Sequence, residues 1–189
     1  MSDTALEATR RRLTAKQADT VDRLGRAAVE LLCRDGFTGL TVRRVAAEAG
    51  VGAATAYTYF SSKEHLVAEV FWRRLVASPP ANHDSGDPAT RVTEVLRHIA
   101  LLVADEPEFA CAVTNALLGR DADVEVLRQR IGRDIRDRLS AALGPDIDPE
   151  VVDALEMLYS GALVRAGMGY ASYAEIAHRL EKSARLMLS

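Results

Sequence analysis

The chain has 189 residues, of which 48% are hydrophobic and 5% aromatic, and its formal net charge at pH 7 is −3. This length allows one or two small domains with a substantial buried core, and the few aromatic residues among abundant Ala and Leu favour an all-helical fold. No apolar run approaches the roughly 20 residues that cross a bilayer, and the first residues lack the apolar core of a signal peptide, so neither export nor a membrane partner is expected.

The first 40 residues predict a polar arm followed by an amphipathic helix. Residues 1–13 are polar and are expected to form a flexible basic arm. The spacing of Thr14 and Gln17 is that of a capping box, which predicts a helix start. The apolar positions of this helix recur at helical spacing and comprise Val21, Leu24, Ala28, Leu31 and Leu32. Gly36 is expected to end it.

Residues 41–61 predict two short helices joined by a glycine turn. Thr41 can cap the first helix, and Gly50 can adopt the left-handed conformation that ends it. One apolar face of this helix consists of Val42, Val45, Ala46 and Ala49. The second helix is expected over about residues 52–60, with Ala56, Tyr59 and Phe60 facing inward. This layout is a helix-turn-helix, which places its second helix in the DNA major groove; the alternative is an ordinary pair of packed helices.

A fourth helix is expected directly after this motif. Ser61 and Glu64 have capping-box spacing, so the helix is predicted over about residues 62–77 with Ser61 as its cap. Its apolar positions are Leu66, Val67, Val70, Phe71 and Leu75. The helix continues the head and connects it to the rest of the chain.

The stretch from Ala27 to Leu75 closely resembles the tetracycline-repressor (TetR) family of bacterial transcriptional regulators. The matching motifs are Ala27-Ala28, Gly36-Phe37, Leu40 to Ala46, Ala49 to Gly52, Thr55-Ala56-Tyr57, Tyr59-Phe60 and Ser62 to Leu66. The resemblance implies an all-α fold with an N-terminal three-helix helix-turn-helix head and a C-terminal helical bundle for ligand binding and dimerisation. The implied domains are a flexible basic arm (1–13), the DNA-binding domain (14–61), a connecting helix (62–78) and the ligand-binding and dimerisation domain (88–189).

The resemblance also implies which residues contact double-stranded DNA. Arg43 stands where the family reads a base or grips phosphate, and Tyr57, Tyr59 and Lys63 match contacts to the DNA backbone. The full candidate set is Thr41, Val42, Arg43, Arg44, Gly52, Ala53, Ala54, Thr55, Tyr57, Thr58, Tyr59 and Lys63. Ala53 and Ala54 depart from the family, which often has a polar or basic residue and then Gly or Pro there. Specificity is therefore expected to depend on arginine–guanine contacts, DNA shape and thymine methyl groups.

The charge distribution agrees with a DNA-binding head. Residues 1–75 carry 12 Lys and Arg against 9 Asp and Glu, whereas residues 76–189 carry 12 against 18. The head is thus positive and the remainder acidic, which limits non-specific binding to nucleic acid. The arginines of residues 10–12 are expected either to track DNA or to form a solvated tail.

The second half of the chain predicts a loop and then five helices. Pro and Gly mark the loop over about residues 78–88. The helices are expected over about residues 89–104, 107–118, 123–143, 149–168 and 172–188. Asp148 with Pro149 is a typical helix start.

The last two helices are candidates for a dimer interface. Their candidate residues are Leu155, Leu158, Gly161, Ala162, Ala166, Tyr173, Ala177, Leu180, Ala184 and Met187. Periodicity alone fits packing within one subunit equally well. The resemblance favours an intersubunit four-helix bundle, and a two-fold homodimer matches an inverted-repeat operator.

The resemblance further implies a pocket for a small-molecule effector. Candidate lining residues are Trp72, His98, Leu102, Phe109, Val113, Thr114, Leu117, Met157, Leu158 and Tyr159. They are mostly apolar with a few polar groups, which suits a hydrophobic or amphipathic ligand. The alternative is an ordinary helical core.

No enzyme chemistry is expected. The four histidines lack metal-ligand spacing, and the chain has neither a phosphate-binding glycine loop nor a nucleophile elbow. No metal and no cofactor are therefore predicted. Cys33 and Cys111 stand singly in apolar helical contexts and are expected to be buried thiols.

These observations predict a sequence-specific transcriptional regulator. The expected form is a dimeric repressor that is released from a palindromic operator by its ligand in the bacterial cytoplasm, where DNA-bound copies lie on the nucleoid. The alternative is a ligand-binding or interaction module with little specific DNA binding, which the alanines at positions 53 and 54 allow.

Overall fold

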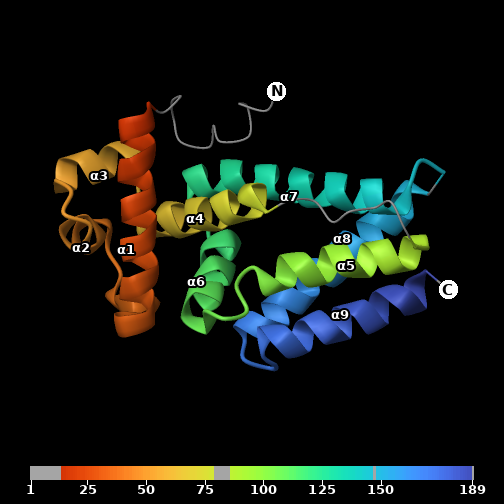
Figure 1. Cartoon of the computed structure of the whole chain (residues 1–189). Helices are drawn as coiled ribbons and strands as arrows, with labels where there is room; N and C mark the ends of the chain where they lie inside the picture. Colours follow the sequence, from red (N-terminus) through yellow and green to blue (C-terminus); the bar gives the residue numbers. More distant parts are fainter. Residues whose placement is uncertain (1–13, 79–85, 147, 189) are drawn as a thin grey trace. The chain divides into compact units, whose positions relative to one another are not determined.

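The computed structural model describes residues 14–78, 86–146 and 148–188, and over these ranges it contains nine α-helices and no strand (Figure 1). The predicted all-α fold is confirmed. The predicted arm and most of the predicted loop lie outside the described residues. The fold divides into two compact units, unit 1 with Met1–Ala77 and Glu108–Arg128, and unit 2 with Ser78–Pro107 and Gln129–Ser189.

Unit 1 contains the predicted head. Its helices are α1 (Ala15–Gly39), α2 (Val42–Glu48), α3 (Ala53–Tyr59) and α4 (Lys63–Ala77), together with α6 (Pro107–Leu118) and the first turns of α7 (Ala122–Leu143). Its largest fully buried side chains are Leu24, Leu31, Leu32, Leu40, Phe60, Leu66, Leu75, Phe109 and Leu127. α1 packs against α2 and α4, and α2 packs against α3. Residues 108–128, which the sequence grouped with the C-terminal domain, thus belong to the same unit as the head.

The ends of α1 and α4 test the predicted capping. At the start of α1 the Thr14 hydroxyl accepts from the Gln17 amide and the Gln17 side chain accepts from the Thr14 amide, as the capping box predicts. Gly36 interrupts the helical geometry of α1 with a φ of 66°. At α4 the prediction was wrong by one residue, because the Ser62 hydroxyl accepts from the His65 amide at 2.9 Å.

Unit 2 contains the longer helices of the C-terminal region. These are α5 (Pro88–Leu101), the remainder of α7, α8 (Pro149–Gly167) and α9 (Tyr173–Met187). α5 and α9 lie side by side, and α8 also packs on α9 (Figure 1). α5 ends before the predicted residue 104 because the following amides of Leu102, Ala104 and Glu106 each bond to the carbonyl three residues earlier.

The two cysteines differ in exposure. Cys33 is exposed and Cys111 is partly buried, so the prediction of two buried thiols is wrong for Cys33. Leu31 and Leu32 just before it are buried, and the next position on a helix turns by about 100° toward solvent. Within the described ranges, no helix combines the length and apolarity that crossing a membrane requires.

Candidate DNA-binding surface

The turn between α2 and α3 has a defined local geometry. The Thr41 hydroxyl caps α2 by accepting from the Arg44 amide at 3.2 Å. At the other end Gly50 has a φ of 63°, its amide donates to the Ala47 carbonyl, and the Val51 amide donates to the Ala46 carbonyl. These two bonds form a Schellman motif, in which the left-handed position favours glycine.

The outward face of α3 carries small and hydroxylic groups without charge. Ala56 and Phe60, the residue directly after α3, are fully buried and fix the inward side of the helix. The exposed residues are Ala54, Thr55, Tyr57 and Thr58, with Ala53 partly buried beside them. Tyr57 is 51% exposed, while the Thr58 hydroxyl donates to the Ala54 carbonyl within the helix. This surface offers methyl groups, hydroxyls and one aromatic ring, as the sequence predicted.

The three cations predicted to contact DNA are held differently. Arg43 is exposed, and its guanidinium has no partner within the described residues. Arg44 is bound to the Asp35 carboxylate and donates to the Gly39 carbonyl at 2.5 Å. Lys63 donates to the Phe37 carbonyl at 2.9 Å and lies 4.2 Å from the centre of the Phe37 ring. Of the three, only Arg43 is unconstrained by contacts inside the head.

The remaining predicted DNA contacts divide by exposure. Thr41 and Gly52 are exposed and Tyr59 is partly buried. Val42 is only 3% exposed, so its side chain packs in the head and only its backbone is available to DNA.

A polar cluster at the junction of α3 and α4 was missed by the sequence interpretation. The Ser61 hydroxyl donates to the Asp123 carboxylate at 2.5 Å and lies 3.2 Å from Nδ1 of His65. His65 is 2% exposed, and its ring meets the Phe60 ring edge-on at 5.7 Å between centroids. Asp123 stands in the first turn of α7, so Ser61, in the link between α3 and α4, is bonded to α7 inside unit 1.

The predicted effector-pocket residues are distributed over both units. Trp72, Phe109, Val113, Thr114 and Leu117 belong to unit 1, and His98, Leu102, Met157 and Tyr159 belong to unit 2. Phe109 is fully buried, with the Arg74 guanidinium 4.4 Å from its ring centre. The indole N–H of Trp72 is buried without a hydrogen-bond partner in the described part of the chain.

Two of these residues show opposite surroundings. Burial, and then the nearby Tyr173, raise the pKa of the Tyr159 phenol above its ordinary value. Met157, by contrast, is 70% exposed, so its side chain lies on the surface of the subunit and not inside its core.

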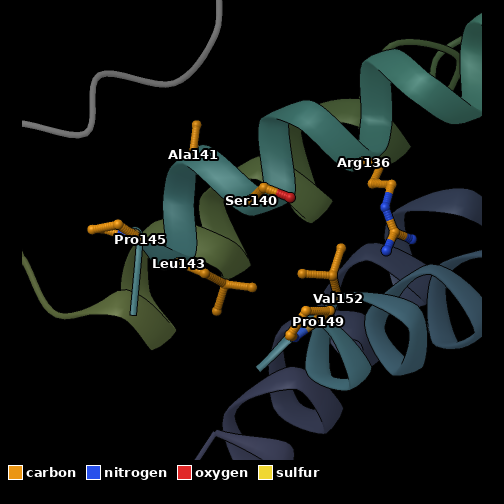
Figure 2. A pocket seen from close by; sticks show the side chains of 8 residues that line it. Arg136, Ser140, Ala141, Leu143, Pro145, Pro149 and Val152 are labelled. Atoms are coloured by element: carbon orange, nitrogen blue, oxygen red, sulfur yellow. The ribbon is translucent and has the colours of Figure 1, made fainter. Parts of the chain in front are cut away.

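Two hollows on unit 2 are lined entirely by described residues. One recess of about 540 Å³ lies where α7 ends and α8 begins, over Leu143, Pro145 and Val152 (Figure 2). At its edge Arg136 binds both Asp153 and Glu156 at 2.5 Å, and these bonds raise the pKa of its guanidinium. The second is a groove of about 370 Å³ along α8 and α9.

The groove along α8 and α9 contains part of the predicted dimer set. Its lining includes Leu158, Gly161, Ala162 and Leu180, joined by the exposed Met157. The other predicted residues that are buried within the subunit are Leu155, Ala166, Tyr173, Ala177 and Ala184, and Leu180 is itself only 1% exposed. Met187 is 42% exposed. Fewer residues are therefore exposed to a partner subunit than the predicted dimer set contains.

Comparisons with known proteins identify the head and extend beyond it. Residues 24–70 match the family model for bacterial regulatory proteins of the tetR family. The chain is 49% identical over 177 residues to an uncharacterized HTH-type transcriptional regulator of Mycobacterium tuberculosis, covering 92% of this chain and 83% of that protein. It is 27% identical over 169 residues to the HTH-type transcriptional repressor KstR of Rhodococcus jostii, covering 86% and 79% of the two chains.

Solved structures agree on the fold. A TetR transcriptional regulator from a Rhodococcus species has a TM-score of 0.72 at 23% identity, with 88% of this chain and 96% of that chain covered. The match of the head motifs, the relative at 49% identity and the shared fold lead to one conclusion. The chain belongs to the TetR family of bacterial helix-turn-helix transcriptional regulators.

Proposed function

We propose that this regulator is a homodimeric repressor that binds an inverted-repeat operator and is released by a hydrophobic or amphipathic small molecule. The observation that carries the proposal is the exposed, uncharged face of α3 together with Arg43, which is exposed and has no partner among the residues that the structure describes. The relative KstR, which is itself named a repressor, supports the direction of regulation.

The head can bind a specific DNA sequence although its exposed surface on α3 has few polar groups. Arg43 can donate two hydrogen bonds to guanine, and exposed methyl groups of Ala54 and Thr55 can contact thymine. The exposed Tyr57 ring suits packing on the sugar–phosphate backbone. Lys63 keeps two N–H donors after its bond to Phe37, so a phosphate contact remains part of the proposal.

The groove along α8 and α9 supports a two-fold dimer. Gly161 and Ala162 allow a partner helix to approach closely, and the 70% exposed Met157 provides apolar surface to bury. A two-fold dimer presents two heads to successive major grooves, which requires an inverted repeat.

The dimer is tested with matched glycine substitutions. A Cβ added at Gly161, or at Gly132 on α7, meets no atom within 4 Å, so each position has open space where a new side chain begins. Gly161→Leu should raise the dimer dissociation constant, whereas Gly132→Leu should leave it unchanged in analytical ultracentrifugation. Equal dimerisation of both variants would place the interface elsewhere.

We propose a hydrophobic or amphipathic effector because most of the candidate pocket residues are apolar and a few are polar. His98 is half-buried and bonded to Ser78, and the Thr114 hydroxyl donates to the Ala110 carbonyl. The FadR regulator of Bacillus subtilis, 15% identical with a TM-score of 0.63, has been solved with stearoyl-CoA. Stearoyl-CoA is therefore a suitable first probe of the amphipathic class. A ligand releases DNA only if it binds the DNA-incompetent arrangement of the two heads more tightly.

The deciding experiment is selection of bound duplexes from a random pool at physiological salt, followed by sequencing. An enriched inverted repeat supports the proposed repressor, and release of that duplex by stearoyl-CoA, with a short-chain acyl-CoA as control, supports the effector class. Binding that is weak, salt-sensitive and without enrichment would instead favour the alternative of an interaction module with little specific DNA binding.

A further inference from the structure

α1 supplies a side chain to the turn of the helix-turn-helix. Arg23 lies in the middle of α1, and its Nη2 donates to the Ala49 carbonyl at 2.5 Å. The same nitrogen lies 3.4 Å from the Gly50 carbonyl. These carbonyls stand 26 and 27 residues away in sequence, at the point where α2 has ended and the chain turns toward α3.

The hydrogen bonds of the turn explain why an arginine is needed there. The Schellman motif satisfies the carbonyls of Ala46 and Ala47, and the Val45 carbonyl accepts from the Ala49 amide. The carbonyls of Ala49 and Gly50 follow in the chain, and both accept from the Arg23 guanidinium. A cation at a helix C-terminus is also favoured by the helix dipole.

α3 itself has little buried side-chain surface to fix its position. α2 and α3 have seven residues each, which is too short for independent stability. Of the residues within α3, Ala56 is the buried one. α1 therefore fixes the turn from outside, and Gly50 permits the close approach, because a Cβ there would stand 3.3 Å from Nη2 of Arg23.

We propose that Arg23 is a positioning residue for operator reading: it holds the α2–α3 turn through backbone carbonyls and so sets the orientation of α3, without contacting DNA phosphate. This proposal rests on the proposed operator binding. It distinguishes Arg23 from the cations that act on DNA directly.

The test compares Arg23→Ala with Arg26→Ala in the full chain. Arg26 lies one turn further along α1, is exposed, and has no partner among the described residues, so its variant removes the same charge without removing the carbonyl bonds. Affinities are measured for the selected operator duplex and for a scrambled duplex at several salt concentrations. Circular dichroism and sedimentation confirm that the variants remain folded and dimeric.

Arg23→Ala should weaken operator binding about tenfold, the loss expected when α3 has its DNA-binding orientation about one tenth of the time. Its affinity for the scrambled duplex and the salt slope of operator binding should equal those of the unaltered protein. Arg26→Ala should change none of the three. Arg23→Lys, which offers a single ammonium to the Ala49 carbonyl, should recover part of the loss.

Two outcomes would overturn the proposal. Equal loss on both duplexes with a salt slope lower by about 0.9 would make Arg23 a phosphate contact, and operator binding equal to that of the unaltered protein would leave it no role. If the unaltered protein prefers no duplex, the proposed repressor function fails, and hydrogen exchange still tests Arg23. The amides of α3 should then exchange faster in Arg23→Ala than in Arg26→Ala, and equal rates would refute the positioning role.

Discussion

The short helices α2 and α3 of the head differ from the α5–α8–α9 group of unit 2 in how much each helix buries, because α2 has three buried residues and α3 has one. In the head, Arg23, Arg44 and Lys63 each donate to a backbone carbonyl near the end of a helix. In unit 2 the helices have 14 to 19 residues and are joined mainly by apolar burial, with six buried residues on α5 and five on α9.

The difference follows from helix length. A helix of seven residues presents two turns and can bury few side chains, so directed bonds from its neighbours must fix its orientation. A longer amphipathic helix buries a continuous stripe, and packing alone fixes it. Loss of a single contact in the head should therefore change the orientation of α3 as well as stability, whereas in unit 2 it should change stability alone.

The largest expected effect is a cavity in unit 2. Leu155 is fully buried on α8, so Leu155→Ala should lower the free energy of unfolding by about 2–5 kcal/mol. Leu186 on α9 is 73% exposed, and Leu186→Ala should change it by less than about 0.5 kcal/mol. Urea denaturation at one protein concentration measures both, and a small cost at Leu155 would mean that packing does not dominate this unit.

The second expected effect distinguishes Arg43 from Arg44, which is bound to groups inside the head. Arg43→Ala should remove a base preference of about 1–3 kcal/mol at one operator position. Arg44 is held by Asp35 and the Gly39 carbonyl, so Arg44→Ala should lower affinity without altering which base is preferred. Repeating the duplex selection with each variant measures this. If base preference changes with Arg44→Ala instead, Arg44 leaves its partners on binding DNA.

The third expected effect concerns the bond between α7 and the α3–α4 junction. Asp123→Ala removes the acceptor of the Ser61 hydroxyl and should lower the stability of the head by about 1–2 kcal/mol. Asp123→Asn keeps an acceptor oxygen and should cost less. Hydrogen exchange of the α3 and α4 amides measures the effect locally. If both variants exchange these amides as slowly as the unaltered protein, the junction does not depend on this bond.

The smallest expected effect is the loss of one helix cap in unit 2. The Ser172 hydroxyl accepts from the first turn of α9, so Ser172→Ala should cost about 1 kcal/mol in thermal unfolding. A cost as large as that of Leu155→Ala would contradict the view that directed bonds are secondary in this unit.

The same cap predicts a dependence on pH. Hydrogen bonds from the Ser172 backbone and hydroxyl lower the pKa of Glu175. Because the folded pKa is lowered, this contribution is present above the ordinary pKa of a glutamate and is lost as pH falls through the lowered value. The acid dependence of stability should therefore be weaker in Ser172→Ala than in the unaltered protein.

Local sequence determined much of this molecule. The capping box at Thr14, the interruption at Gly36 and the left-handed turn at Gly50 follow from bonds and backbone preferences within a few residues. Helix periodicity predicted α6 to the residue and the other helices to within a few, and the family motifs predicted the head. These features depend on neighbours in the chain, which a sequence displays directly.

Only the tertiary structure decided which element packs against each helix face. Periodicity shows that a side chain is apolar or charged, but contacts between residues distant in the chain decide which element covers it. Arg23 meets a carbonyl 26 residues away and Ser61 an acid 62 residues away, and no spacing rule predicts either pair. The predicted dimer face was divided for the same reason, because α5 and α8 pack against α9 and cover part of its apolar stripe within the subunit.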